Sequence, residues 1–212
     1  MSEGGRGATK AAGGRRAATY DRLNERLNQA GLDRWRDRLV DGLTGDVLEI
    51  GAGTGLNLHR YPAGARLTLL EPDQDYADRL RERAAQLGRT VTVVDGVAEA
   101  IPLPDASFDH VVVSLVLCTV PDPEAALREI ARVLRPGGSL AFLEHVRDEG
   151  RLGRWQDRLT WLQRLLAGGC RLNRDPVDAI GRAGLRIERL ERFTMPPGHP
   201  LLRSAVQGRA LR

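Results

Sequence analysis

The chain has 212 residues, which is long enough for one domain with a sizeable hydrophobic core. Its net charge is +4 and only 4% of its residues are aromatic, so it lacks the basic and aromatic pattern of a nucleic-acid-binding surface. No apolar stretch approaches the ~20 residues that span a bilayer, and the N-terminal residues lack the apolar segment of a secretory signal. We therefore expect a cytoplasmic protein without a nucleic-acid partner or a stable membrane anchor.

Cysteine and histidine are sparse. The two cysteines, Cys118 and Cys170, make neither a disulfide framework nor a CxxC pair, so we expect both to be small buried side chains in a reducing compartment. The histidines are His59, His110, His145 and His199. They show no metal-ligand spacing along the chain, so the sequence predicts no metal.

The N-terminal part of the chain divides into a tail and a helical cap. Residues 1–18 are rich in glycine, alanine and arginine, and we expect a flexible basic tail there. Residues 19–42 follow as a cap, because apolar residues such as Leu23 and Leu27 recur at helical spacing. Residues 19–212 are then expected to form a single domain that includes this cap.

Apolar runs alternate with helix-like runs through the middle of the chain, which predicts an α/β sheet of mostly parallel strands. The expected strands are residues 46–50, 66–71, 90–95, 108–114 and 139–144. Only a short helix, ending near Pro62, fits between the first two strands. Longer helices are expected at residues 73–87, with Asp73 as the cap and Gly88 as the stop, and at residues 123–134.

The alternation of strand-like and helix-like runs ends after the fifth strand. Residues 151–168 form an amphipathic pattern, which predicts an inserted helix. We expect a lid over the substrate; a helix that merely packs on the sheet, or one whose basic face contacts a membrane surface, is the alternative. Residues 175–183 read as a short helix. Residues 185–191 and 205–211 alternate in polarity, which is typical of edge or antiparallel strands.

The turn after the first strand reads LEIGAGTGL and contains Gly51, Gly53 and Gly55. A dinucleotide fingerprint requires glycine where this chain has Leu56, so a pyrophosphate cradle is disfavoured. Glu49 would repel a diphosphate, whereas its charge suits the ammonium group of a ligand. Glu71, at the end of the second strand, suits the ribose diol of either cofactor. Together these residues favour S-adenosylmethionine, which has an ammonium group and no phosphate.

Four segments resemble, in the expected order, the class I S-adenosylmethionine-dependent methyltransferases. They read LEIGAGTG, LLEPD, GVAEAIPLPDASFDHVVVS and REIARVLRPGGSLAFLEH, and they cover about half of the chain. The resemblance implies a Rossmann-like seven-stranded sheet, mostly parallel with an antiparallel last strand, with helices on both faces and a helical lid after strand five. It also implies S-adenosylmethionine as cofactor and S-adenosylhomocysteine as product.

The resemblance further implies a set of cofactor-binding residues. Those on the methionine side are Glu49, Gly51, Ala52, Gly53, Gly55 and Asn57, and those at the ribose and adenine are Glu71, Pro72, Val97, Ala98 and Glu99. Ser114 and Leu115 would lie beneath the transferred methyl group, and Tyr20 would cover the cofactor or simply pack there. Many relatives have an acid at the position of Val97, so another group or water must contact the adenine amino group here.

The segments SLVLCTV, EHV and LLAGGCRLNRD resemble the animal alkyl-thiol methyltransferases and their bacterial relatives, some of which methylate reduced dithiol natural products. This implies a small hydrophobic thiol as acceptor. The oligomeric state is not given by the sequence, and we favour a monomer. The alternatives are transfer to oxygen, nitrogen or carbon of a small metabolite, quinone precursor or phospholipid headgroup, and a non-catalytic cofactor-binding module. His145 and Tyr20 are the candidate catalytic residues: His145 accepts the thiol proton or orients the acceptor, or is a structural histidine bonded to backbone.

Overall fold

The computed structural model describes residues 4–166, 170–171, 173–195 and 203–212. In chain order the strands are β1 (Gly45–Ile50), β2 (Ala65–Leu70), β3 (Val91–Val94), β4 (Phe108–Ser114), β5 (Leu134–His145), β6 (Arg186–Thr194) and β7 (Ser204–Leu211). The helices are α1 (Gly4–Leu27), α2 (Asp33–Val40), α3 (Gln74–Gln86), α4 (Pro123–Val133), α5 (Gly150–Leu166) and α6 (Pro176–Arg182), with a π-helical segment, η1 (Asn28–Leu32), between α1 and α2. No helix in the described ranges offers the long apolar stretch that crossing a bilayer requires.

The described strands form one seven-stranded sheet in the order β3-β2-β1-β4-β5-β7-β6. Strands β1 to β5 are parallel to one another, and β7 runs antiparallel to both β5 and β6. This confirms the Rossmann-like sheet with an antiparallel last strand. The strand order reverses between β1 and β4, and ligands of open α/β sheets bind outside the carboxyl ends of the strands at such a point.

Helices cover both faces of the sheet. On one face α2 and α3 bury apolar side chains such as Leu39 and Leu80 against the sheet. On the other face α4 and α6 do the same with residues such as Ile130 and Ile180. Because side chains alternate along a strand, Val47 and Glu49 of β1 lie on the α2 face, whereas Leu48 and Ile50 lie on the α4 face.

Aspartates cap the start of three helices, and the sequence predicts the first of these caps, Asp73. Asp73 accepts hydrogen bonds from the amides of Asp75 and Tyr76, and it thereby caps α3. Asp122 and Asp175 cap α4 and α6 in the same way. Each cap satisfies amides that have no partner within the helix, so the helices begin where the sequence places them.

The structure differs from the sequence prediction in two connecting segments. No short helix follows β1; residues 53–60 are consecutive turns, because hydrogen bonds of Leu58 to Gly55 and of Arg60 to Asn57 span three residues rather than four. Strand β5 is also longer than expected and begins at Leu134, so the RPGG segment belongs to it instead of merely ending α4. An irregularity in its pairing with β4 accommodates the extra residues.

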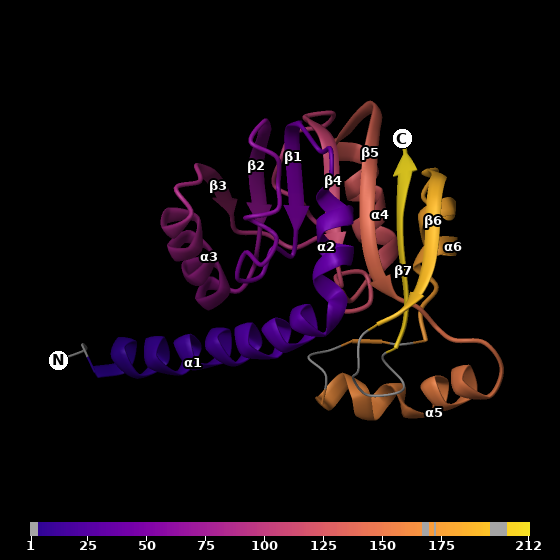
Figure 1. Cartoon of the computed structure of the whole chain (residues 1–212), viewed down its shortest axis with the longest axis horizontal. Helices are drawn as coiled ribbons and strands as arrows, with labels where there is room; N and C mark the ends of the chain where they lie inside the picture. The colour runs from indigo at the N-terminus through magenta and orange to yellow at the C-terminus, as the bar shows by residue number, and fades with distance from the viewer. Residues whose placement is uncertain (1–3, 167–169, 172, 196–202) are drawn as a thin grey trace.

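The N-terminal segment is helical over its described residues, and the flexible basic tail at residues 1–18 stays a prediction. From Gly4 onward the residues expected to be flexible are part of α1, where the high helix propensity of alanine opposes the effect of the glycines. The expected cap over residues 19–42 is bent rather than continuous, because Gly31 has a φ of 115° in η1. As Figure 1 shows, α1 lies across the carboxyl ends of the parallel strands, and α2 rises along the sheet.

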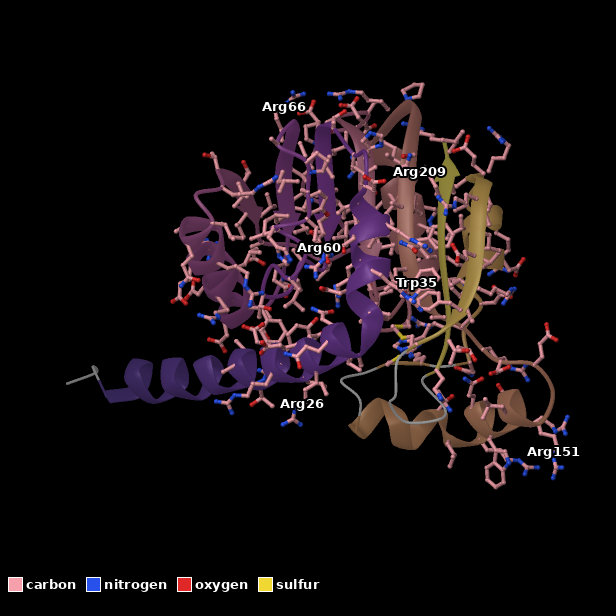
Figure 2. All side chains as sticks on the ribbon, in the orientation of Figure 1. Arg26, Trp35, Arg60, Arg66, Arg151 and Arg209 are labelled. Carbon is pink, nitrogen blue, oxygen red and sulfur yellow. The ribbon has the colours of Figure 1, made fainter. Side chains whose placement is uncertain are left out.

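The predicted inserted helix corresponds to α5, and residues 167–168 of the prediction lie outside the described residues. Figure 1 places α5 near the carboxyl ends of the parallel strands, at the same edge as α1. In Figure 2, Arg26 of α1 and Arg151 of α5 project away from the sheet at this edge, whereas Arg66 lies at the opposite edge. Both helices therefore lie at the edge where the site forms.

We predict that Gly208→Ala destabilises the protein by about 1–3 kcal/mol, the usual cost of overpacking. A Cβ atom at Gly208 would lie 2.4 Å from the carbonyl oxygen of Arg189 and 2.5 Å from Phe142 Cζ. Gly181→Ala is the matched control: it lies in α6 with no atom within 4 Å of its added Cβ, and it should leave stability equal or improve it. Urea unfolding measures both; an unchanged midpoint for Gly208→Ala would contradict the prediction.

Candidate functional site

The loop after β1 requires glycine at three positions. Gly51, Gly53 and Gly55 have φ values of 63°, 57° and 78°. A Cβ atom would lie 2.7 Å from Val116 at the first position and 2.6 Å from Leu80 at the third. The chain therefore turns in a conformation that favours glycine, with its backbone pressed against neighbouring segments. Ala52, between the first two glycines, is buried.

Glu49 lies buried beneath this loop. Its Oε1 accepts a hydrogen bond of 2.7 Å from Asn57 Nδ2, and its Oε2 accepts one of 2.8 Å from the Tyr61 hydroxyl. Burial raises the pKa of Glu49, while these two hydrogen bonds lower it. Burying a carboxylate is costly unless it is bonded or paired, so this arrangement both braces the loop and favours a cationic group nearby.

Arg36 of α2 completes the network, and the sequence patterns did not single it out. Its guanidinium donates to Asn57 Oδ1 at 3.1 Å and to Ser114 Oγ at 3.4 Å. It also donates to Asn24 Oδ1 at 3.1 Å and to Asn28 Oδ1 at 3.2 Å. All four acceptors are neutral and the residue is buried, so desolvation lowers the pKa of Arg36. A ligand carboxylate would compensate this buried charge.

Glu71 connects the end of β2 to the glycine loop. Its Oε2 accepts a hydrogen bond of 2.7 Å from the Gly53 amide, and its Oε1 accepts one of 3.0 Å from the Asp73 amide. Burial raises the pKa of Glu71, and these amide bonds oppose that rise. Glu71, the predicted ribose-binding residue, is therefore in direct contact with the glycine loop. One ligand can then contact both of them. Pro72 is exposed beside them.

The predicted adenine residues lie in a short loop after β3. Val97 is 47% exposed, whereas Ala98 is buried. The Glu99 carboxylate accepts a hydrogen bond of 3.2 Å from the Asp122 amide, at the start of α4. The loop thus presents one apolar surface residue and one buried small residue, and the carboxylate of Glu99 is held toward α4.

Helix α1 covers the glycine loop. Tyr20 is half-buried, and its hydroxyl lies 3.5 Å from the position of a Cβ on Gly53. Its ring lies 5.2 Å from that of Tyr76 in α3, measured between centroids. Burial raises the pKa of Tyr20, so the hydroxyl stays protonated near neutral pH. Its neighbour Asp21 pairs with Arg83 of α3 at 3.0 Å, which holds the helix in place.

The loop after β4 leaves the sheet in a strained conformation. Leu115 has a φ of 61°, which is unfavourable for a residue with a side chain. Its amide donates to the Leu143 carbonyl at 2.8 Å. Ser114, the preceding residue, contacts Arg36 as described above. The two residues expected beneath the methyl group therefore lie at the reversal of strand order, with the first of them in the Arg36 network.

Glu144 of β5 fixes this loop, and it is a second residue that the sequence patterns did not single out. It is fully buried and accepts hydrogen bonds of 2.8, 2.9 and 3.2 Å from the amides of Val116, Leu117 and Cys118. Burial raises the pKa of Glu144 to about 7 against the opposing effect of these bonds. The Glu144 carboxylate therefore fixes the path of the loop after β4 at the carboxyl ends of β4 and β5.

His145 and both cysteines converge beside this loop. The Sγ atoms of Cys118 and Cys170 each lie 3.8 Å from His145 Nδ1. Both thiols are free and buried, which confirms the prediction of buried cysteines, and Leu152 and Leu159 of α5 pack against them. A hydrogen bond from Cys118 lowers the pKa of Cys170 to about 5, while the same interaction and burial raise that of Cys118.

A cavity of about 100 Å³ lies beside these groups at the carboxyl ends of β4 and β5. Its lining includes Leu117, Cys118, Leu127, His145, Arg174 and Pro176. The charged side chains of Glu124, Asp175 and Arg182 also line it. A lining that mixes apolar side chains with a thiol, an imidazole and charged groups suits a small molecule that has both an apolar body and a polar reacting atom.

Comparison with known proteins gives consistent matches. Residues 48–142 match the family model of a methyltransferase domain. The chain is 36% identical over 173 residues to thiol S-methyltransferase TMT1A of Homo sapiens, covering 78% of this chain and 70% of that protein. It is 31% identical over 171 residues to phosphatidylethanolamine N-methyltransferase of Cereibacter sphaeroides, covering 75% and 78%.

A solved structure supports the same relationship. The chain is similar to a SAM-dependent methyltransferase of Thermotoga maritima, described as a possible histamine N-methyltransferase. The TM-score is 0.68 and the sequence identity is 26%, with 93% of this chain and 96% of that chain covered. The similarity therefore extends over nearly the whole fold, beyond the segment that carries the glycine loop.

We predict that Arg36→Gln weakens binding of S-adenosylhomocysteine by about tenfold or more, because a charge-assisted hydrogen bond to its carboxylate contributes about 1.5–3 kcal/mol. Binding of 5′-methylthioadenosine, which lacks the amino-acid end, should be nearly unchanged. Arg38→Gln, on the exposed side of the same helix, is the control and should bind both ligands normally. Calorimetry measures these affinities; an equal loss for both ligands in Arg36→Gln would refute a carboxylate contact.

Proposed function

The chain belongs to the class I S-adenosylmethionine-dependent methyltransferases, and we propose that it transfers the methyl group of this cofactor to the thiol of a small hydrophobic molecule. The cofactor supplies a sulfonium methyl group that is already a good electrophile, and S-adenosylhomocysteine is the product. The residues of the chain then need to bind the cofactor, align the acceptor and exclude water.

In this proposal, residues at the ends of different strands bind different parts of the cofactor. Glu71 accepts hydrogen bonds from the ribose hydroxyls, and the loop of Gly51, Gly53 and Gly55 lies along the methionine side. Arg36 and Glu49 are both buried and carry opposite charges. Arg36 therefore binds the carboxylate of the cofactor, and the negative charge of Glu49 favours its ammonium group. Tyr20 of α1 lies over the loop, where its ring would shield the cofactor from water.

The proposal that the acceptor is a thiol rests mainly on the 36% identity to a human thiol S-methyltransferase over most of this chain. The chemistry at the end of β5 supports it, since the cavity beside His145 is partly apolar. A thiol also demands little of the enzyme, because its pKa of about 8.5 leaves some thiolate near neutral pH. A reduced dithiol natural product is the narrower substrate that we propose on the resemblance of the segments around Cys118 and Cys170.

A second candidate is N-methylation of a phospholipid headgroup. The 31% identity to a bacterial phosphatidylethanolamine N-methyltransferase favours it. An amine acceptor must lose its proton before it can attack. Its ammonium form has a pKa near 10, whereas a thiol has a pKa near 8.5, so the amine depends more on a general base. The higher identity to the human thiol S-methyltransferase and the small size of the cavity, about 100 Å³, favour the sulfur acceptor over this alternative.

We propose the reducing cytoplasm as the location and a monomer as the acting form. Both cysteines are free thiols, and such thiols, like a thiol acceptor, stay reduced in that compartment. The cofactor groups named above all come from one chain, so the proposed site is complete within a single copy.

We predict that the protein S-methylates small hydrophobic thiols when it is incubated with labelled cofactor and matched thiols, phenols and amines of similar size. The thiolate is the strongest nucleophile of these near neutral pH, and the cavity accepts apolar bodies. Mass spectrometry identifies the methylated atom. Products formed only from amines would instead support the phospholipid alternative, and cofactor binding without any product would support a binding module.

We also predict that His145→Gln lowers kcat by about a hundredfold at pH 7, and less at pH 9. In the variant the acceptor thiol must ionise unaided, and it does so only as the pH approaches its own pKa of about 8.5. His59→Gln, on an exposed loop, is the control and should retain the parent pH profile. A pH-independent loss in His145→Gln would show that the residue does not help to form the thiolate.

A further inference from the structure

Three side chains that can bind a metal ion, Cys118, His145 and Cys170, lie around one point. They come from the loop after β4, the end of β5 and the segment before α6. The donor atoms Sγ, Nδ1 and Sγ all lie within 4.8 Å of one another. Within the described ranges this is the only group of three or more such residues that could hold a metal ion. Sequence spacing predicted no metal because it compares neighbours along the chain, whereas these ligands meet only in the fold.

The distances match the requirements of zinc. A tetrahedral Zn²⁺ lies about 2.3 Å from thiolate sulfur and about 2.0–2.1 Å from imidazole nitrogen, which separates sulfur from nitrogen by about 3.5 Å. In this protein both sulfurs lie 3.8 Å from the same nitrogen. A shift of a few tenths of an ångström in three side chains would complete the geometry.

The backbone holds these ligands in place. The Arg171 amide donates to the Cys118 carbonyl at 2.7 Å, which ties the two cysteine segments together. Glu144 binds the Cys118 amide on the other side, and Arg174 donates to the carbonyls of Leu117 and Val120 in the same loop. Zinc sites need such supporting hydrogen bonds around their ligands.

We propose that Cys118, His145 and Cys170 bind Zn²⁺ and leave its fourth tetrahedral position open to the acceptor. Both cysteines bind the ion as thiolates, and any proton that a cysteine still carries is released to solvent, so the two thiolates balance the +2 charge of the ion. Three protein ligands with one open position are typical of catalytic rather than structural zinc. The cavity of about 100 Å³ that Cys118 and His145 help to line gives a ligand access to this position.

The role of the open position rests on the proposed thiol acceptor. The acceptor sulfur replaces a water molecule on the zinc and loses its proton to solvent. The bound thiolate then attacks the methyl carbon, the carbon–sulfur bond of the cofactor breaks, and its electron pair stays on the sulfur of S-adenosylhomocysteine. Zinc keeps its oxidation state throughout, so no oxidant or reductant is needed. His145 then acts as a zinc ligand, which accounts for its proposed effect on thiolate formation.

The test uses the full chain, purified without an affinity tag under reducing conditions. After equilibration with zinc chloride and removal of excess metal, elemental analysis should find about one zinc per chain. Cys118→Ser, Cys170→Ser and His145→Gln should each weaken zinc binding by roughly tenfold or more. His59→Gln should bind as the parent does. Replacing zinc by Co²⁺ should give thiolate-to-cobalt charge-transfer bands and the visible absorption of a tetrahedral ion.

Two results would overturn the site. One is zinc binding by the parent that is no stronger than binding by a Cys118→Ser, Cys170→Ser double variant whose thermal unfolding is unchanged. The other is a protein whose two cysteines are joined by a disulfide after preparation with zinc, because the same sulfurs cannot also bind the ion as thiolates. Mass spectrometry with and without reduction detects that disulfide.

The link to catalysis is tested separately from the acceptor itself. Adding a substrate thiol to the cobalt-loaded protein should shift the charge-transfer bands, because a third sulfur joins the ion. Bands that do not respond to a thiol that the enzyme methylates would overturn the role of the open position while leaving the proposed function intact. Zinc binding together with methylation of amines alone would refute the thiol acceptor and leave the metal site standing.

Discussion

Three buried carboxylates at the carboxyl ends of parallel strands hold together the loops that form this site. Glu49 in β1 binds Asn57 and Tyr61, and Glu71 after β2 binds the amides of Gly53 and Asp73. Glu144 in β5 binds three successive amides of the loop after β4. A buried carboxylate is stable only when hydrogen bonds replace its water, and loop amides need partners for the same reason.

This shared requirement links the architecture to the chemistry. The reversal of strand order opens a crevice between β1 and β4, and the carboxylates determine how the chain crosses it. Glu49 and Glu71 lie on the side where the cofactor is expected, and Glu144 lies on the side of the cavity and the cysteines. Arg36 joins the two sides, because it binds both Asn57 of the glycine loop and Ser114 of β4.

The helices that cover the edge are attached by polar contacts as well as by apolar packing. Asp21 pairs with Arg83 beside Tyr20, and α1 thereby lies over the glycine loop (Figure 1). Helix α5 places Leu152 and Leu159 against the two cysteines. Covering of this kind excludes water and strengthens electrostatic interactions within the site. Methyl transfer benefits from both effects, since water is a competing nucleophile.

The sequence by itself determined the family, the parallel strands, the Asp73 cap and the glycine loop, because each depends on local conformation or on the period of apolar residues. It also identified Glu71 at a strand end, and the fold places that residue against Gly53. Only the tertiary structure decided that Arg36 reaches Asn57 and Ser114, and that Cys118 and Cys170 meet at His145. Those contacts join residues up to 78 positions apart, and their distances depend on how helices pack and strands align, which no local pattern specifies.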